Sequence, residues 1–182
     1  MKKKILVVVD MQKDFIQGSL GSLDALGIVE NVVEKIKSYS DKDDLIIVTL
    51  DTHNDEYLKT LEGKKLPIPH CIEGTDGHAL DNRIQSVLNE NVVYVKKETF
   101  GSFKLSDIIK EHLKRDRLDA RDAEIELVGL CTDICVVSNA ILLRAMFPNT
   151  KICVSSSCCA GTSKERHNAS LEVMRSCQID VN

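Results

Sequence analysis

The chain contains the segment Ile125-Glu126-Leu127-Val128-Gly129-Leu130-Cys131-Thr132-Asp133-Ile134-Cys135, in which a short aliphatic run passes directly into the start of an amphipathic stretch. Similar runs recur along the chain at 5–9, 45–50, 92–95, 152–155 and 178–181. They are rich in Val and Ile and are mostly continuous rather than alternating, which is typical of strands buried on both faces.

Helical patterns fill the gaps between these runs. Apolar residues recur at helical spacing in four stretches, at 28–36, 105–113, 136–145 and 169–174. Alternation of strand and helix predicts parallel strands with crossover helices on both faces, which is a three-layer α/β/α sandwich. The 182 residues suit a single domain, 1–182. The stretch 51–80 lacks sustained periodicity, and a long irregular insertion of this kind is usually functional.

Composition and charge exclude several classes of protein. A hydrophobic content of 43% argues against disorder, and a net charge of −4 argues against a nucleic-acid partner, which requires a basic face. No apolar run approaches the roughly 20 residues needed to cross a bilayer, so no membrane partner is expected. The basic start at residues 1–4 is followed by only a few apolar residues before Asp10, which is too short for a secretory leader. The seven cysteines are odd in number, so we expect free thiols and a cytoplasmic location.

In open α/β sheets, ligands bind beyond the carboxyl ends of the strands. Polar residues follow the predicted strands at these positions. Asp10 follows the first strand, Asp51 the second, and Cys135 lies just beyond the fourth. Lys96 and Lys97 follow the third strand, and strand alternation allows only one of these two side chains to enter the site. Each residue alone is more often a solvated or structural group, but an acid, an amine and a thiol at one rim favour catalysis.

Cys135 is the strongest candidate for a nucleophile. With Thr132 or Asp133 as the N-cap, Cys135 falls in the first turn of a helix, where the helix dipole favours the thiolate. The backbone amides of Cys131 and Cys135 are candidates for an oxyanion hole. The alternative is a buried structural cysteine, and the predicted proximity of Asp10 and Lys97 argues against it.

A second group of residues is typical of a metal site. Asp51 and His53 are two residues apart at a strand end and therefore point the same way, while Glu62 and His70 lie in the irregular stretch that follows. One carboxylate with two imidazoles suits zinc, manganese or iron. The alternative is that Asp51 caps a turn and His53 is exposed. His78 and His112 are interpreted as surface residues.

Taken together, these motifs make the chain resemble the isochorismatase-like cysteine hydrolases, and among them the nicotinamidases (pyrazinamidases). The matching blocks occur in the family's order across nearly the whole chain: 8–15 (VVDMQKDF), 51–53 (DTH), 70–75 (HCIEGT), 97–103 (KETFGSF) and 129–136 (GLCTDICV). The 70–75 block together with 51–53 points to nicotinamidase rather than isochorismatase.

This resemblance implies a six-stranded parallel sheet of order 3-2-1-4-5-6, a cis peptide between Leu130 and Cys131, and a homo-oligomer. It also implies roles for individual residues. The catalytic triad would be Asp10, Lys97 and Cys135. The ligands of a divalent metal, most simply zinc, would be Asp51, His53, His70 and, as in some relatives, Glu62. Relatives commonly carry an aromatic residue before the metal-binding histidine, whereas this chain has Leu66-Pro67-Ile68-Pro69-His70. Phe15 and Phe103, with Phe100, are the candidates for contacts to the substrate ring.

The function implied by the resemblance is metal-dependent hydrolysis of nicotinamide to nicotinate and ammonia through a thioester. Two alternatives stay open. One is a hydrolase of the same family that acts on another small amide or on a vinyl ether. The other is a non-catalytic or redox protein that uses Cys135 or the adjacent Cys158 and Cys159.

Overall fold

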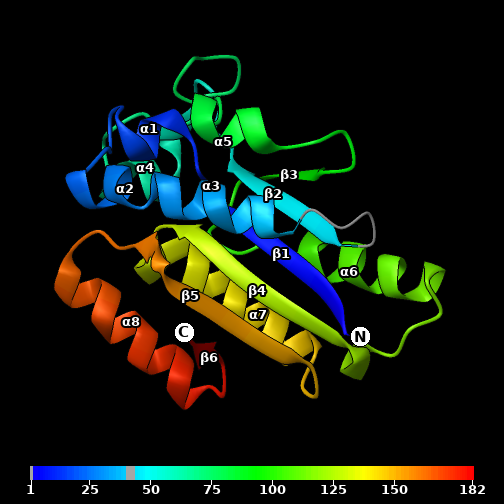
Figure 1. Ribbon diagram of the computed structural model, residues 1–182. Coiled ribbons are helices and arrows are strands. Elements are labelled where there is room, and N and C mark those ends of the chain that lie inside the picture. The colour runs from blue at the N-terminus through cyan, green and yellow to red at the C-terminus, as the bar shows by residue number, and fades with distance from the viewer. Residues whose placement is uncertain (1, 40–43) are drawn as a thin grey trace.

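The sheet at the centre of the molecule has the predicted architecture. The computed structural model describes residues 2–39 and 44–182, and within these ranges the strands form a single six-stranded sheet. The strands are β1 (Lys3–Val9), β2 (Leu45–Asp51), β3 (Val93–Lys97), β4 (Ala123–Leu130), β5 (Lys151–Ala160) and β6 (Asp180–Val181). Their order is β3-β2-β1-β4-β5-β6 and every pairing is parallel, which confirms the predicted topology (Figure 1).

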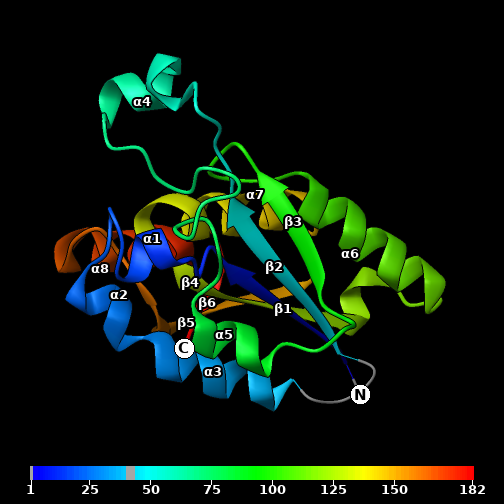
Figure 2. The same cartoon turned by 90° about the horizontal axis from the view of Figure 1, so that it is seen from above.

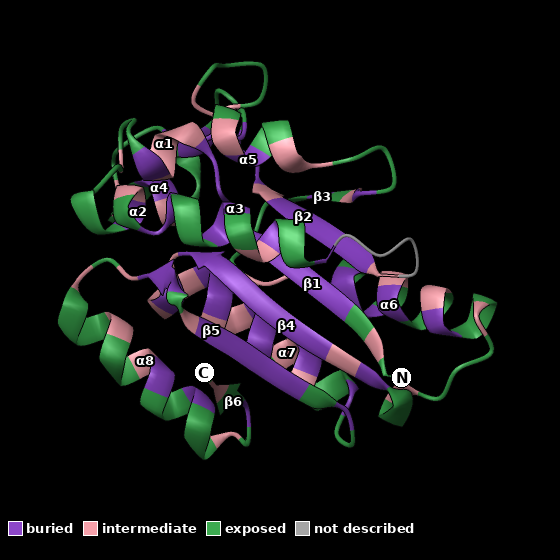
Figure 3. Cartoon of the chain, viewed as in Figure 1, coloured by how far each residue is buried: buried purple, intermediate pink, exposed green. Residues whose placement is uncertain are grey.

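Helices cover both faces of the sheet (Figure 2). One face carries α6 (Lys104–Arg115), α7 (Val137–Met146) and α8 (Lys164–Ser176), and the other carries α1 (Lys13–Ile16), α2 (Leu23–Gly27), α3 (Val29–Ser38) and α5 (Asn82–Val87). In β1, Ile5 and Val7 pack with the first set of helices, while Leu6 and Val8 pack with the second. Burial on both sides explains the continuous apolar runs (Figure 3). No helix in the described ranges has the length and apolar character needed to cross a membrane.

Strand β5 is longer than its apolar run predicts, because polar residues continue it. The predicted run 152–155 extends to Ala160, and the register of β5 against β4 shifts between Leu127 and Gly129. Ser155 is buried and donates a hydrogen bond to Glu126 on β4. A serine that is paired inside the protein can occupy a buried strand, and this pairing cannot be read from the local pattern.

The irregular stretch after β2 forms an excursion beyond the sheet. It contains a 3-10 turn (Tyr57–Lys59) and α4 (Leu61–Lys65), which stands away from the other helices in Figure 2. The hydroxyl of Thr60 accepts a hydrogen bond from the Gly63 amide and caps α4. A parallel bridge between His53 and Ile72 then brings the chain back beside the end of β2.

The turn that carries Cys135 differs from the prediction. Thr132–Val136 is a π-helical turn preceded by Cys131, and α7 begins only at Val137, so neither Thr132 nor Asp133 is the N-cap of a regular helix. Their side chains bond elsewhere, because Thr132 Oγ1 lies 2.8 Å from His167 Nδ1 and Asp133 accepts hydrogen bonds from Thr162. The peptide between Leu130 and Cys131 is cis, as the resemblance implies.

Candidate active site

An acid, an amine and a thiol meet in the interior at the carboxyl edge of the sheet. Asp10 follows β1, Lys97 ends β3, and Cys135 lies in the π-helical turn after β4. The Lys97 Nζ atom lies 2.7 Å from Asp10 Oδ2 and donates a hydrogen bond of 3.3 Å to Cys135 Sγ. All three side chains are buried. The geometry therefore brings together the three residues that the sequence places at this rim.

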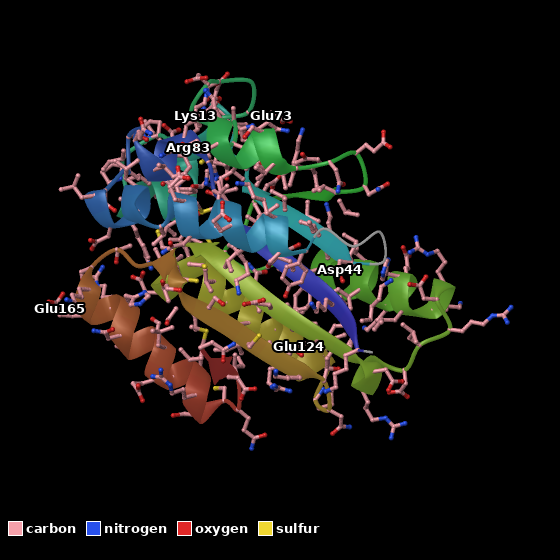
Figure 4. The ribbon with its side chains drawn as sticks, viewed as in Figure 1. Lys13, Asp44, Glu73, Arg83, Glu124 and Glu165 are labelled. Atoms are coloured by element: carbon pink, nitrogen blue, oxygen red, sulfur yellow. The ribbon has the colours of Figure 1, made fainter. Side chains whose placement is uncertain are left out.

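The two adjacent lysines occupy opposite environments. Lys97 is buried in the site, whereas Lys96 is exposed and forms a 2.5 Å ion pair with Glu73. The Glu73 side chain lies at the periphery of the molecule (Figure 4). Strand alternation thus separates the two lysines as predicted.

The charges in the site influence one another strongly. Burial by itself would lower the pKa of Lys97, but the nearby Asp10, Cys135 and Asp51 groups raise it well above its usual value. Burial raises the pKa of Asp10 despite the opposing effect of Lys97. Burial and the Asp10 carboxylate also raise the pKa of the Cys135 thiol. The amine is therefore charged at neutral pH, and the thiol keeps its proton until a base removes it.

A hydroxyl on β2 orients the Asp10 carboxylate. Thr49 Oγ1 donates a 2.7 Å hydrogen bond to Asp10 Oδ1, and the Asp10 amide points back at the same hydroxyl from 3.2 Å. Asp10 has a φ of 48°, in the left-handed region that residues other than glycine seldom adopt. Thr49 is fully buried and was not singled out in the sequence, since it lies inside an apolar run.

A group of metal-binding residue types lies next to this site. One ligand atom from each of Asp51, His53 and His70 falls within 4.8 Å of the others. His53 Nε2 lies 3.0 Å from Asp51 Oδ2, and His70 Nε2 lies 3.5 Å from the same oxygen. Glu62 Oε1 lies 3.8 Å from both of these nitrogens. Asp51, His53 and His70 are all buried, which argues against the alternative of a capping aspartate and an exposed histidine.

The protonation pattern of this group fits a divalent cation. His70 Nδ1 is 2.9 Å from the Ile68 carbonyl oxygen, which can only accept, so Nδ1 carries the proton. With Nδ1 protonated, Nε2 is the atom that faces Asp51 and Glu62: it donates toward Asp51 while the ring is charged, and it offers a lone pair to a cation once the ring is neutral. Hydrogen bonds from His53 and His70, aided by Lys97, overcome burial and hold the pKa of Asp51 well below its usual range. An ionised carboxylate with two imidazole nitrogens is a donor set for zinc, manganese or iron.

Aromatic rings support the two histidines. The buried Tyr57 ring lies 4.7 Å from the His53 ring and 5.0 Å from the His70 ring, measured between centroids, and its hydroxyl donates to the Leu66 carbonyl. The Phe15 ring lies 5.5 Å from the His70 ring. Tyr57 was not singled out in the sequence, because a lone tyrosine in an irregular stretch carries no pattern.

Gln12 connects the two groups of residues through the backbone. Its side-chain oxygen accepts from the Asp51 amide at 2.8 Å, and its side-chain nitrogen donates to the Asp51 carbonyl at 2.9 Å and to the His78 carbonyl at 2.8 Å. His78 and His112, which the sequence predicts to be surface residues, are both partly exposed. His78 Nε2 lies 2.9 Å from Thr52 Oγ1, which places it against the end of β2.

The remaining predicted roles concern groups at the margin of the site. Cys131 is partly exposed directly after β4, and its carbonyl accepts from the amides of Ile134 and Val136. Phe103 is 66% exposed where α6 begins. The oxyanion hole at Cys131 and Cys135, and the ring contacts of Phe15 and Phe103, stay predictions. All seven cysteines lie in the described ranges and are free thiols, including the adjacent Cys158 and Cys159.

The open parallel sheet and the buried acid, amine and thiol at its carboxyl edge are typical of an α/β enzyme. The isochorismatase domain model matches residues 4–181, so the chain belongs to the isochorismatase family. The chain is 29% identical over 147 residues to an uncharacterised isochorismatase family protein, PncA, of Bacillus subtilis (strain 168), covering 76% of this chain and 77% of that protein.

Solved structures with the same fold include two amidases. The nicotinamidase PncA from Bacillus subtilis is 26% identical with a TM-score of 0.82, and the match covers 98% of each chain. The pyrazinamidase of Pyrococcus horikoshii, solved in complex with zinc, is 25% identical with a TM-score of 0.77, and the match covers 99% of this chain and 98% of that one.

Proposed function

We propose that this protein is a cysteine amidohydrolase that converts nicotinamide to nicotinate and ammonia through a thioester on Cys135. The observation that carries the proposal is the position of the Lys97 amine, which contacts both Asp10 and the Cys135 sulfur beside the group formed by Asp51, His53 and His70. The similarity to solved nicotinamidase and pyrazinamidase structures supports the choice of substrate.

The triad performs acid–base and nucleophilic chemistry in sequence. Asp10 removes the proton of the Cys135 thiol, and the Lys97 ammonium stabilises the thiolate as it forms. The thiolate attacks the amide carbon, and Asp10 returns the proton to the departing ammonia. Asp10 then takes a proton from water, which attacks the thioester and releases the carboxylate product. Burial favours the neutral form of Asp10 and so makes it a stronger base than an exposed aspartate.

The other polar groups hold the substrate. Asp51, His53 and His70, with Glu62 beside them, would hold a divalent ion, and such an ion supplies a binding point for the pyridine nitrogen. The pyridine ring would then be oriented with its carboxamide toward Cys135, which is catalysis by positioning. The amides of Cys131 and Cys135 would bind the oxyanion. Phe15, whose ring packs on His70, would contact the substrate ring.

The decisive experiment measures ammonia released from a panel of amides. Nicotinamide should be hydrolysed by the purified protein, activity should fall after chelation, and added zinc or manganese should restore it. Cys135→Ala should abolish turnover. Cys153→Ala is the matched control, because Cys153 is also a buried free thiol but lies on β5, and it should keep parent activity.

The same panel tests the alternative of another small amide. The segment before His70 carries Ile68 where an aromatic side chain could cover a pyridine ring, and this favours including non-aromatic amides. Faster turnover of such an amide than of nicotinamide would replace the substrate but keep the chemistry. Substantial turnover by Cys135→Ala would exclude the thioester scheme.

A further inference from the structure

Asn139 lies in the first turn of α7 and is fully buried, although the chemistry above gives it no task. Its side-chain nitrogen donates a 2.8 Å hydrogen bond to the carbonyl of Cys135, one helical turn earlier. The same nitrogen donates to the Phe100 carbonyl at 3.2 Å, and the side-chain oxygen accepts from the Ser102 amide at 2.9 Å. Both ends of the amide are therefore in use.

The three partners belong to two segments that carry different parts of the triad. Cys135 is the thiol itself, while Phe100 and Ser102 lie in the loop that runs from Lys97 at the end of β3 to the start of α6. One buried amide thus joins the turn of the nucleophile to the loop that follows the lysine. In the sequence, Phe100 and Ser102 lie 39 and 37 residues before Asn139, whereas Cys135 lies only 4 residues before it.

Close packing at Gly101 fixes the same loop against α7. A Cβ atom added at Gly101 would lie 2.6 Å from a methyl group of Leu142 and 3.4 Å from the Ser138 side chain. Ser138 and Leu142 flank Asn139 on α7. The loop is therefore held by a tight backbone approach as well as by the amide.

We propose that Asn139 is a positioning residue, which holds the Lys97 loop and the Cys135 turn in register so that the lysine amine reaches the sulfur. This inference rests on the proposed cysteine chemistry. Removing the amide leaves the buried Cys135 carbonyl, the part-buried Phe100 carbonyl and the part-buried Ser102 N–H without this partner, and these groups must shift to find another. A displacement of about 1 Å between reacting groups can lower a rate by roughly a hundredfold.

The test compares Asn139→Ala and Asn139→Asp with the parent. Aspartate keeps an acceptor for the Ser102 amide, but it has no N–H to donate to the Cys135 and Phe100 carbonyls. Both variants should therefore lose the link between the loop and the turn. We expect alkylation of Cys135 by iodoacetamide, followed by mass spectrometry, to slow by roughly tenfold or more. Backbone amides of residues 99–103 should exchange hydrogen faster. Turnover should lose kcat with KM little changed, and zinc affinity should match the parent.

The control separates positioning from a general loss of stability. Thr150 is also buried, and its hydroxyl donates to the Ala120 carbonyl at the amino ends of β4 and β5, opposite the edge of the sheet that carries the site, so Thr150→Val removes a hydrogen bond of a buried residue without touching either segment. Thr150→Val should alkylate at the parent rate. If either Asn139 variant fails to fold, Gly101→Ala is the substitute. It perturbs the same loop through the close contact with Leu142, and it should also slow alkylation of Cys135.

Alkylation and hydrogen exchange at parent rates in the Asn139 variants would overturn the inference. The same slowing in Thr150→Val would also overturn it, because the effect would then be one of stability. Neither measurement needs a substrate. A parent protein that hydrolyses no amide would reject the proposed function, and the alkylation result would still decide whether Asn139 positions the thiol.

Discussion

Gln12 holds the peptide groups of Asp51 from both sides, accepting from its amide at 2.8 Å and donating to its carbonyl at 2.9 Å. Gln12 lies only two residues after Asp10, so one short segment fixes both an acid of the triad and the backbone of a candidate metal ligand. The two groups of functional residues are therefore positioned as a unit.

This arrangement predicts that Gln12→Ala weakens metal binding although Gln12 is not a ligand. Without its amide, Asp51 loses two backbone hydrogen bonds and its carboxylate is free to move away from the histidines. Loss of such an orienting partner typically costs roughly 10- to 100-fold in metal affinity. Competition titration with a zinc chelator measures the change, and the exposed Gln85 on α5 provides the control Gln85→Ala. Equal zinc affinity in Gln12→Ala and the parent would contradict the prediction.

The adjacent lysines provide a second prediction, because the structure buries only one of them. Lys97→Met leaves the buried Asp10 and Asp51 carboxylates without their cation, and removing one partner of a buried ion pair costs about 3–5 kcal/mol of unfolding free energy. Lys96→Met breaks an exposed pair with Glu73, and such a solvent-screened pair contributes little to stability. Urea unfolding in the presence of a chelator measures both values.

The same two variants separate the effects of the lysines on the thiol. Without the amine that contacts its sulfur, Cys135 in Lys97→Met should react with iodoacetamide more slowly than in the parent, while Lys96→Met should react at the parent rate. Similar stability and similar reactivity in the two variants would contradict the ion-pair geometry described for Lys97.

The fold and the main site could be predicted because they depend on local pattern and on one general rule. Continuous Val and Ile runs indicate buried parallel strands, and the rule that ligands bind at the carboxyl ends of such strands brings Asp10, Lys97 and Cys135 together. The period of a strand sends Lys96 and Lys97 to opposite sides, and the family resemblance selects Lys97. None of these inferences requires knowledge of a specific long-range contact.

The residues that sequence reasoning missed depend on contacts that no local pattern encodes. Gln12 acts on a backbone 39 residues away, and Thr49 reaches Asp10 across the same separation. Asn139 sits in an otherwise helical stretch, where a buried amide cannot be distinguished from an exposed one. The π-helical turn was missed for a related reason, since the side chains of Thr132 and Asp133 are bound by distant residues rather than by the turn itself.

A third prediction concerns Glu62, whose carboxylate lies 3.8 Å from the Nε2 atoms of His53 and His70. Burial and the Asp51 carboxylate raise the pKa of Glu62, which means that its charged form is disfavoured. A cation bound beside it would offset both effects and stabilise the charged form. Glu62→Gln should therefore weaken zinc binding by roughly tenfold, which is less than the loss caused by His70→Ala. The exposed Glu56, which pairs with Lys59 on the same excursion, gives the control Glu56→Gln. Zinc titration that gives Glu62→Gln the parent affinity would leave the site with three protein ligands.

The last prediction concerns a buried carboxylate outside the site, Glu126 on β4. Its oxygens accept hydrogen bonds from Lys35 at 2.8 Å, from Tyr39 at 2.5 Å and from Ser155. Burial alone would raise the pKa of Glu126, but these three donors together lower it below its usual value of 4.5. Because the folded state holds the carboxylate in its charged form, this group stabilises the protein above the unfolded-state pKa and loses that contribution as pH falls.

Glu126→Gln should accordingly cost about 1–3 kcal/mol of unfolding free energy near neutral pH, since a charged acceptor with three donors is replaced by a neutral amide. The difference between parent and variant should stay constant well above pH 4.5 and shrink as the pH falls below that value, where the unfolded state takes up the proton first. Urea unfolding of both proteins across this range, with a chelator present, measures the difference. Glu124→Gln is the control, because Glu124 lies on the same strand and pairs at the surface with Lys151, and its small effect should follow no such profile. A difference between Glu126→Gln and the parent that grows toward acid pH would mean that Glu126 is protonated in the folded protein, and the network of Lys35, Tyr39 and Ser155 would then have to be reassigned.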